Sequence, residues 1–260
     1  MMLPHIKVKI SDIDFNVESI SELLYRDNSR TNTSLPFQDR IFHAFPCIKE
    51  KIKEDMSNKE IYNIVEKVIY LEYEKNRKAM LERKVELQKR FDSVFPVMLE
   101  RMIDLFEMNW PEKYKEIACY LGLYTVFPRN VLDKVFWLHY QTPEETVIRA
   151  SLHEINHFIL FEKWKQMHGY TYNKEPVHPE VLWFLEEMSV DPTLNSPKMQ
   201  EVAPYPQRAY EKFYQNSWNG ISFEQHIINI FNEKTSMEDF LDKAFQFIKE
   251  HHEEIVIKCG

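Results

Sequence analysis

The chain has 260 residues, of which 44% are hydrophobic and 28% are charged, and its formal net charge is −8. This composition is typical of a folded globular protein, and the acidic balance argues against a non-specific nucleic-acid partner. Only 4 glycines occur, which disfavours glycine-rich phosphate loops and favours helices. We therefore expect a mainly α protein (α+β) with a small β-sheet.

The amino-terminal residues and the cysteines indicate the cellular compartment of the protein. The first residues, MMLPHIKVKISDIDF, contain no apolar core of signal-peptide length, and no run approaches the roughly 18 apolar residues of a membrane helix. Cys47, Cys119 and Cys259 are odd in number and far apart, as expected of reduced thiols. These features predict a cytoplasmic protein with no membrane partner. They do not predict the oligomeric state.

The first part of the chain predicts one strand followed by helices. Alternating apolar and polar residues predict a strand over 5–15, and Ser19 or Ser21 could open a short helical turn that ends at Tyr25. Residues 26–36 predict a loop, and residues 37–54 predict a helix interrupted near Pro46. From Ser57 the pattern is helical for about 35 residues, and a further helix is predicted over 93–108. The pattern of the long helix is compatible with a coiled-coil arm or with a helix that packs on the protein along one side, and we favour the second interpretation.

The middle and the end of the chain predict short strands and closing helices. Segments 117–127 and 134–140 are rich in aromatic and β-branched residues, so we expect two strands joined by a hairpin or longer loop at PRNVLD. After residue 195 we expect a loop that leads into a short helix from 206. Helices 222–232 and 236–253 follow, opened by Ser222 and by the capping box S-M-E-D.

Residues 142–169 contain the pentapeptide His153-Glu154-Ile155-Asn156-His157, an H-E-x-x-H sequence. On a helix the two histidines project from one face about one turn apart. Both imidazoles can then bind one metal ion, with Glu154 beside a water on that metal. Residues at both ends predict the helix independently of the motif. At its start we expect Thr142 as the N-cap, Pro143 as the first helical residue and Glu145 as the capping-box partner, and at its end Gly169 as the stop. Its apolar flanks predict a buried helix, in which histidines need a partner.

This motif resembles the active-site helix of the zincin metallopeptidases. The chain lacks the glycine and third histidine with which metzincins continue, but it carries Glu187 and Asp191 at i, i+4 on a second predicted helix, 178–195, which begins at Pro179 and is stopped by Pro192. That arrangement is similar to the E-x-x-x-D of the gluzincins. The resemblance covers about residues 142–195. The change of composition near residue 117 predicts a mainly helical region, 1–115, and a zincin-like metal-site region with C-terminal helices, 116–260, although the two can form one continuous domain.

The resemblance implies a Zn²⁺ ion held by His153, His157 and Glu187, with Asp191 hydrogen-bonded to His153. The distance in sequence from His157 to Glu187 is longer than in thermolysin-like members, so the intervening QMHGYTYNKEPVHP, 166–179, would be an inserted loop. Glu186 is therefore a rival third ligand. His168 and His178 are further rivals.

The resemblance implies a zinc-dependent hydrolase, in the first place a metallopeptidase with a peptide or protein substrate. Glu154 would be the general base. Tyr210 is our choice for stabilising the transition state, from a set that also holds Tyr205, Arg208, Tyr214 and His226. Zincins place a small sheet before the active-site helix, so strand 134–140 would be the edge that pairs with extended substrate.

Two alternatives remain open. One is a non-catalytic binding or regulatory protein on a zincin scaffold, with a structural or vestigial metal site. A carboxylate beside the metal, as Glu154 would be, argues against a purely structural site. The other is metal-dependent hydrolysis of a non-peptide amide.

Overall fold

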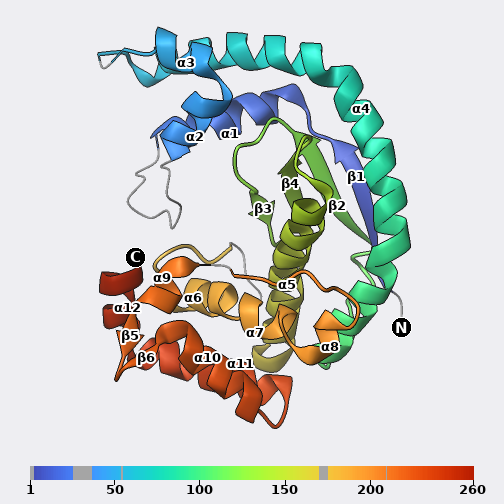
Figure 1. The fold of residues 1–260 in the computed structure, drawn as a ribbon, viewed down its shortest axis with the longest axis vertical. Helices are drawn as coiled ribbons and strands as arrows, with labels where there is room; N and C mark the ends of the chain where they lie inside the picture. The colour runs from blue at the N-terminus through green and yellow to red at the C-terminus, as the bar shows by residue number, and fades with distance from the viewer. Residues whose placement is uncertain (1–2, 26–36, 54, 170–174, 209) are drawn as a thin grey trace.

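The computed structural model describes residues 3–25, 37–53, 55–169, 175–208 and 210–260. The protein is mainly helical with a small mixed sheet, as the sequence predicted. The predicted loop 26–36 lies outside the described residues, as do residues 170–174 of the expected insertion. Figure 1 shows the sheet in the middle of the molecule, the helices α1 to α3 beyond one end of it and the C-terminal helices beyond the other.

The main sheet has the strand order β1-β2-β4-β3. Strands β1 (His5–Ile10), β2 (Glu116–Gly122) and β4 (Val135–His139) are parallel, and the two-residue β3 (Arg129–Asn130) runs antiparallel to β4. Of the two predicted connections between β2 and β4, the hairpin is therefore wrong and the longer loop is confirmed. Their connector, 123–134, is as long as the dozen or so residues that a parallel crossover needs.

The position of β3 also changes the predicted edge. We expected residues 134–140 to form the edge strand, but β4 lies between β2 and β3, so β3 is the edge. Arg129 therefore belongs to an edge strand of the sheet. β3 comes from the connector, whose three-dimensional path the local sequence pattern does not reveal.

Helix α4 (Asn58–Leu105) is a single helix of 48 residues. The sequence predicted two helices here, but Pro96 lies inside α4 without ending it. Ser57 and Glu60 form a capping box: Glu60 Oε2 accepts from Ser57 N at 2.8 Å, and Ser57 Oγ accepts from Glu60 N. Buried residues recur along α4, which packs on α1, β1 and α8 (Figure 1). The interpretation as a helix packed on one side is confirmed.

The first helices are α1 (Ile13–Tyr25), α2 (Phe37–Ala44) and α3 (Pro46–Lys51). The strand predicted over 5–15 ends at Ile10, and α1 begins earlier than expected. Asp12 explains this change, because its Oδ1 accepts a hydrogen bond from Phe15 N at 2.8 Å, as a residue at a helix start does. The interruption predicted near Pro46 is confirmed.

Helix α5 (Glu144–His168) carries the H-E-x-x-H sequence and is buried along most of its length. Its N-cap is Pro143 without a side-chain cap, so the predictions of Thr142 as the cap and Pro143 as the first helical residue are wrong by one residue. The Thr142 carbonyl instead accepts a hydrogen bond from Arg83 at 3.1 Å. Gly169 ends the helix in the left-handed conformation, with φ of 61°, as predicted.

The predicted helix 178–195 is two helices, α6 (Val181–Met188) and α7 (Val190–Leu194), which meet at Ser189. Pro179 precedes α6, and Pro192 lies in the first turn of α7, where a missing N–H costs nothing. Pro179 as the first helical residue and Pro192 as the stop are therefore wrong, whereas the end predicted at 195 agrees with Asn195 as the C-cap of α7. Thr193 Oγ1 of α7 lies 2.9 Å from Oδ1 of the buried Asn156 of α5, which fixes the two helices together.

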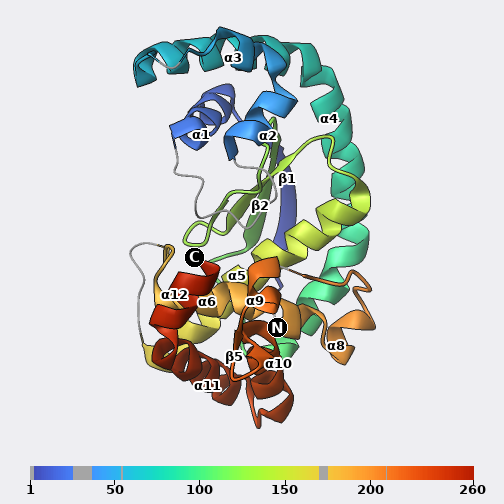
Figure 2. The same ribbon diagram turned by 60° about the vertical axis from the view of Figure 1, so that its left-hand side comes forward.

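The remaining elements close the C-terminal end of the molecule (Figure 2). They are α8 (Pro197–Gln200), α9 (Glu211–Gln215), β5 (Ser217–Trp218), β6 (Ile221–Ser222), α10 (Phe223–Glu233), α11 (Met237–Glu250) and α12 (His252–Cys259). The helix expected from 206 begins at Glu211, and the one expected to reach 253 ends at Glu250. Ser222 and Ser236 are confirmed as N-caps, since each accepts a backbone hydrogen bond at 3.1 Å. The reciprocal half of the predicted capping box is displaced by one residue, because Asp239 Oδ2 accepts from Thr235 N at 3.0 Å.

The boundary predicted at residue 115 falls between α4 and β2. Strand β1 comes from one side of that boundary and pairs along its whole length with β2 from the other side. At the far end of α5, Lys163 donates to the Glu107 carbonyl at 3.2 Å and to Glu238 at 2.7 Å. Across the described ranges, none of the helices combines the length and apolar character needed to cross a membrane.

Candidate metal centre

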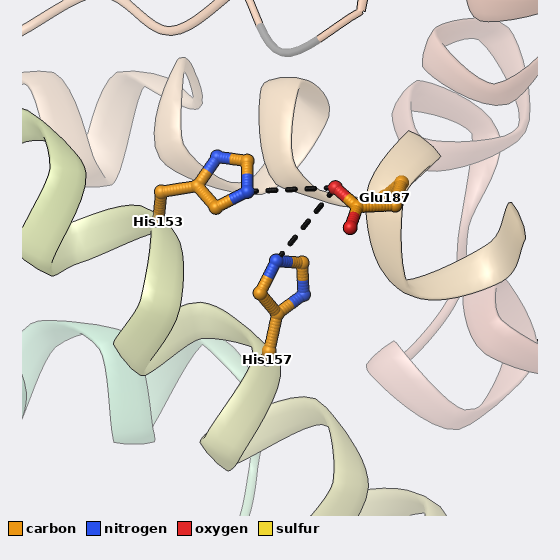
Figure 3. A group of neighbouring side chains, drawn as sticks. All are labelled: His153, His157 and Glu187. Carbon is orange, nitrogen blue, oxygen red and sulfur yellow. Dashed lines mark ion pairs between the residues drawn. The ribbon is translucent and has the colours of Figure 1, made fainter. Parts of the chain in front are cut away.

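His153, His157 and Glu187 lie together at the facing surfaces of α5 and α6 (Figure 3). One ligand atom from each residue lies within 4.8 Å of the other two. Glu187 Oε2 is 3.4 Å from His153 Nε2 and 3.8 Å from His157 Nε2. The three side chains thus point their donor atoms at one small volume, as the ligands of a tetrahedral metal ion do.

Two of these donor atoms are buried without a hydrogen bond. His157 is 0% exposed and Glu187 is 2% exposed. Neither His157 Nε2 nor Glu187 Oε2 has a hydrogen-bond partner among the described residues. Buried polar atoms are rarely left in this state, because each costs about 1–3 kcal/mol unless something binds it. A metal ion satisfies both atoms, so the residues fit the zinc that the resemblance implied.

Glu154 lies beside this group and is 5% exposed. It lies about 100° round α5 from His153, and it contacts the same guanidinium as Glu187, since Arg129 is 3.5 Å from Glu154 Oε2 and 3.4 Å from Glu187 Oε1. Burial raises the pKa of Glu154, and the nearby guanidinium of Arg129 opposes that rise. A carboxylate at this place can accept a proton from a molecule in the site.

Arg129 reaches the centre from the edge strand β3 and contacts carboxylates of α5 and α6. Its NH2 group donates to Glu186 at 2.6 Å and to Glu187 at 3.4 Å, and its NH1 group donates to Glu154 at 3.5 Å. Its Nε forms an ion pair with Glu175 at 2.8 Å. Arg129 is thus the cation around which the carboxylates of the site are arranged.

The two adjacent glutamates of α6 have different surroundings. Glu187 Oε2 faces both histidines, whereas Glu186 is 0% exposed and is paired with Arg129. Burial would raise the pKa of Glu187, but the neighbouring His153 and Arg129 lower it below the ordinary value. Burial raises the pKa of Glu186 well above its ordinary value, although Arg129 opposes the rise. Of the two rivals, the structure groups Glu187 with the histidines.

The two histidines also differ. Burial, together with Arg129 and His153, lowers the pKa of His157 well below its ordinary value. Burial also lowers the pKa of His153, but Glu187 and Glu154 outweigh that effect and raise it overall. A neutral His157 has a free lone pair for a metal. The rivals His168 and His178 lie elsewhere: His168 pairs with Asp242 at 3.3 Å, and His178 packs on Trp183 with ring centroids 4.8 Å apart.

Asp191, which the resemblance assigned to His153, lies in α7 and is 1% exposed. Its Oδ2 accepts a hydrogen bond of 2.5 Å from the Tyr214 hydroxyl. Burial, and then this hydrogen bond, raise the pKa of Tyr214. The role of Asp191 towards His153 remains a prediction, and Tyr214 is an additional partner that the sequence did not indicate.

Tyr210 precedes α9, and its ring packs on Trp183 and Phe213 with centroid distances of 5.7 and 5.3 Å. Burial raises the pKa of Tyr210 well above its ordinary value, and Glu187 and Glu154 raise it further. Tyr210 therefore lies within the electric field of the site. Two of the other candidates have different contacts, because Arg208 pairs with Glu211 at 2.7 Å and His226 lies 3.1 Å from the Trp218 carbonyl.

Sequence reasoning missed Arg129 and Glu175. Arg129 belongs to the connector PRNVLD, and nothing in a short polar segment shows that it turns inward. Glu175 Oε2 accepts from Val131 N at 3.1 Å, so Glu175 holds both the backbone and the guanidinium of this connector. The sequence signal for this contact was that Arg129 is a single arginine in the segment between two carboxylate-rich helices. Only the fold shows which carboxylates it contacts.

Comparisons of the chain with protein-family models, with curated proteins and with solved structures found no match.

Proposed function

We propose that this protein is a zinc-dependent metallopeptidase. The observation that carries the proposal is the group of His153, His157 and Glu187, in which the buried His157 Nε2 and Glu187 Oε2 have no hydrogen-bond partner among the described residues. Two imidazoles and one carboxylate are a common catalytic zinc set, and a fourth position would stay open for water or substrate. A structural site would call for a fourth protein ligand instead.

When bound, zinc lowers the pKa of a water molecule and polarises a carbonyl group. Glu154 would take the proton from the attacking water and return it to the leaving amine. Arg129, 3.5 Å from Glu154, favours the ionised form that can accept this proton. Tyr210 would donate its hydroxyl hydrogen to the oxyanion that develops at the scissile carbonyl. Its high pKa keeps that hydrogen in place at neutral pH.

The proposed substrate is a peptide or protein, and the proposed compartment is the cytoplasm. An extended peptide would lie along β3, because that strand is one edge of the sheet and its Arg129 contacts Glu154 of α5. The cysteines Cys47, Cys119 and Cys259 are free thiols, which agrees with a reducing compartment.

The test is metal content followed by a peptide-library screen. We expect one zinc per chain, lost in Glu187→Gln but kept at saturating zinc in Glu186→Gln. Glu154→Gln should keep the zinc while cleavage falls by about 10²–10⁴-fold. Glu145→Gln, the same chemical change at an exposed position of the same helix, should keep both.

Different failures have different meanings. A protein that takes up no zinc after reconstitution at neutral pH would refute the metal centre. Stoichiometric zinc with no cleavage of any peptide would refute the peptidase and support the non-catalytic alternative.

A further inference from the structure

Two buried polar atoms behind the metal centre face each other without a hydrogen bond. His157 Nδ1 and Glu186 Oε2 are 3.9 Å apart, and neither has a partner among the described residues. A histidine that gives Nε2 to a metal carries its proton on Nδ1, and that N–H needs an acceptor. The separation is only about 1 Å longer than an N–H···O hydrogen bond. Rotation of the Glu186 carboxylate would close this gap.

The other oxygen of Glu186 is already held. Arg129 NH2 donates to Glu186 Oε1 at 2.6 Å, and the same nitrogen donates to Glu187 Oε1 at 3.4 Å. The two glutamates are therefore used in the same way: Oε1 of each faces the guanidinium, and Oε2 of each faces a histidine. The orientation of Glu187 and the orientation of His157 thus depend on one guanidinium.

Arg129 is itself fixed from outside the centre. Glu175 pairs with its Nε at 2.8 Å and accepts from the backbone of Val131 at 3.1 Å, which anchors the guanidinium to the connector after β3. A planar guanidinium presents donors in a rigid fork, so it can hold two carboxylates at fixed angles. A lysine ammonium in its place would be a single point charge.

We propose that Arg129 and Glu186 act as one positioning unit of the metal centre. Glu186 accepts the Nδ1–H of His157, and Arg129 determines which oxygen of Glu187 faces the metal. The unit gives Glu186 a role beside Glu187 that is not that of a ligand. This inference rests on the proposed function, because it requires a metal at His153, His157 and Glu187.

The first test is zinc affinity, measured by competition with a chelator for the full chain. Glu186→Gln and Arg129→Gln should each bind zinc about 10–100-fold more weakly, as changes of partners of metal ligands do. Gln at 186 can still accept from Arg129, but its amide nitrogen cannot accept from His157, so this variant isolates the His157 contact. Arg129→Lys should not restore affinity. The double variant should lose less than the product of the single losses, because the two residues act as one unit.

The second test replaces zinc with Co²⁺, whose visible absorption bands report the geometry of its ligands. At one cobalt per chain, Glu186→Gln and Arg129→Gln should show altered bands, while wild type and the exposed control Glu145→Gln should agree. Circular dichroism will show whether each variant is folded. If Arg129→Gln is unfolded, the affinity and spectrum of Glu186→Gln decide the matter.

The outcomes separate this inference from the proposed function. Wild-type zinc binding and peptide cleavage, with single variants within threefold of wild-type affinity and unchanged cobalt bands, would overturn the positioning unit alone. Single losses that multiply in the double variant would also overturn it, since they would show independent residues. A wild-type chain that binds neither metal would overturn both proposals.

Discussion

Replacing Lys134 tests how the connector that carries Arg129 is held against α5. Lys134 is 1% exposed, and its ammonium pairs with Glu162 of α5 at 2.7 Å and donates to the Val131 carbonyl at 2.8 Å. The substitution Lys134→Met removes the charge but keeps a side chain of similar length. It also keeps the left-handed backbone at this position, where φ is 56°, so the same backbone strain is present in both proteins.

The expected loss follows from the partner that is left behind. Glu162 is 6% exposed, so Lys134→Met would leave a buried carboxylate without its cation. Breaking a buried ion pair in this way costs about 3–5 kcal/mol. For a chain of this size the melting temperature should fall by roughly 10 °C. Replacing both residues, in Lys134→Met/Glu162→Leu, should recover most of the loss, because no charge then remains buried.

The assay is urea unfolding followed by circular dichroism, with free energies of unfolding compared at one pH. Lys78→Met is the matched control, because Lys78 lies on α4 with 89% of its side chain exposed and only a 3.8 Å contact to Glu82. This control should change stability by less than about 0.5 kcal/mol. A loss below about 1 kcal/mol in Lys134→Met, or a double variant no more stable than the single one, would refute the reasoning.

Two further predictions concern buried positions away from the metal centre. Burial, and then Asp191, raise the pKa of Glu224 well above its ordinary value, so the native chain keeps a proton that the unfolded chain loses, and stability should fall as pH rises above the ordinary carboxyl pKa. Glu224→Gln should remove this slope and stabilise the protein at pH 8; equal slopes in urea titrations from pH 5 to 8 would contradict this. A Cβ at Gly122 would lie 2.5 Å from Asn16 Oδ1 and 2.6 Å from the Tyr124 ring, and Asn16 Oδ1 cannot easily move because it accepts from Leu123 N at 2.7 Å. Gly122→Ala should therefore cost about 1–3 kcal/mol in the same urea assay, and wild-type stability would show that this contact yields.

Local sequence was sufficient to predict α5 and the pairing of its histidines. The i, i+4 spacing places His153 and His157 on one face of any helix, and the apolar flanks required that face to be buried. The helix stop at Gly169, the break at Pro46 and the caps at Ser222 and Ser236 were also predictable, because each depends on a residue and its immediate neighbours. For the same reason the class of the fold followed from composition and periodicity.

Tertiary structure alone decided what lies opposite those histidines. The family resemblance favoured Glu187 and left Glu186 as a rival, and the approach of α6 to α5 decides which of these adjacent glutamates faces both imidazoles. The parallel pairing of β2 with β4, and the arrival of Arg129 on β3, depend on the path of the connector through space. Contacts between residues distant in the chain are set by packing over the whole molecule, and local periodicity carries no record of them.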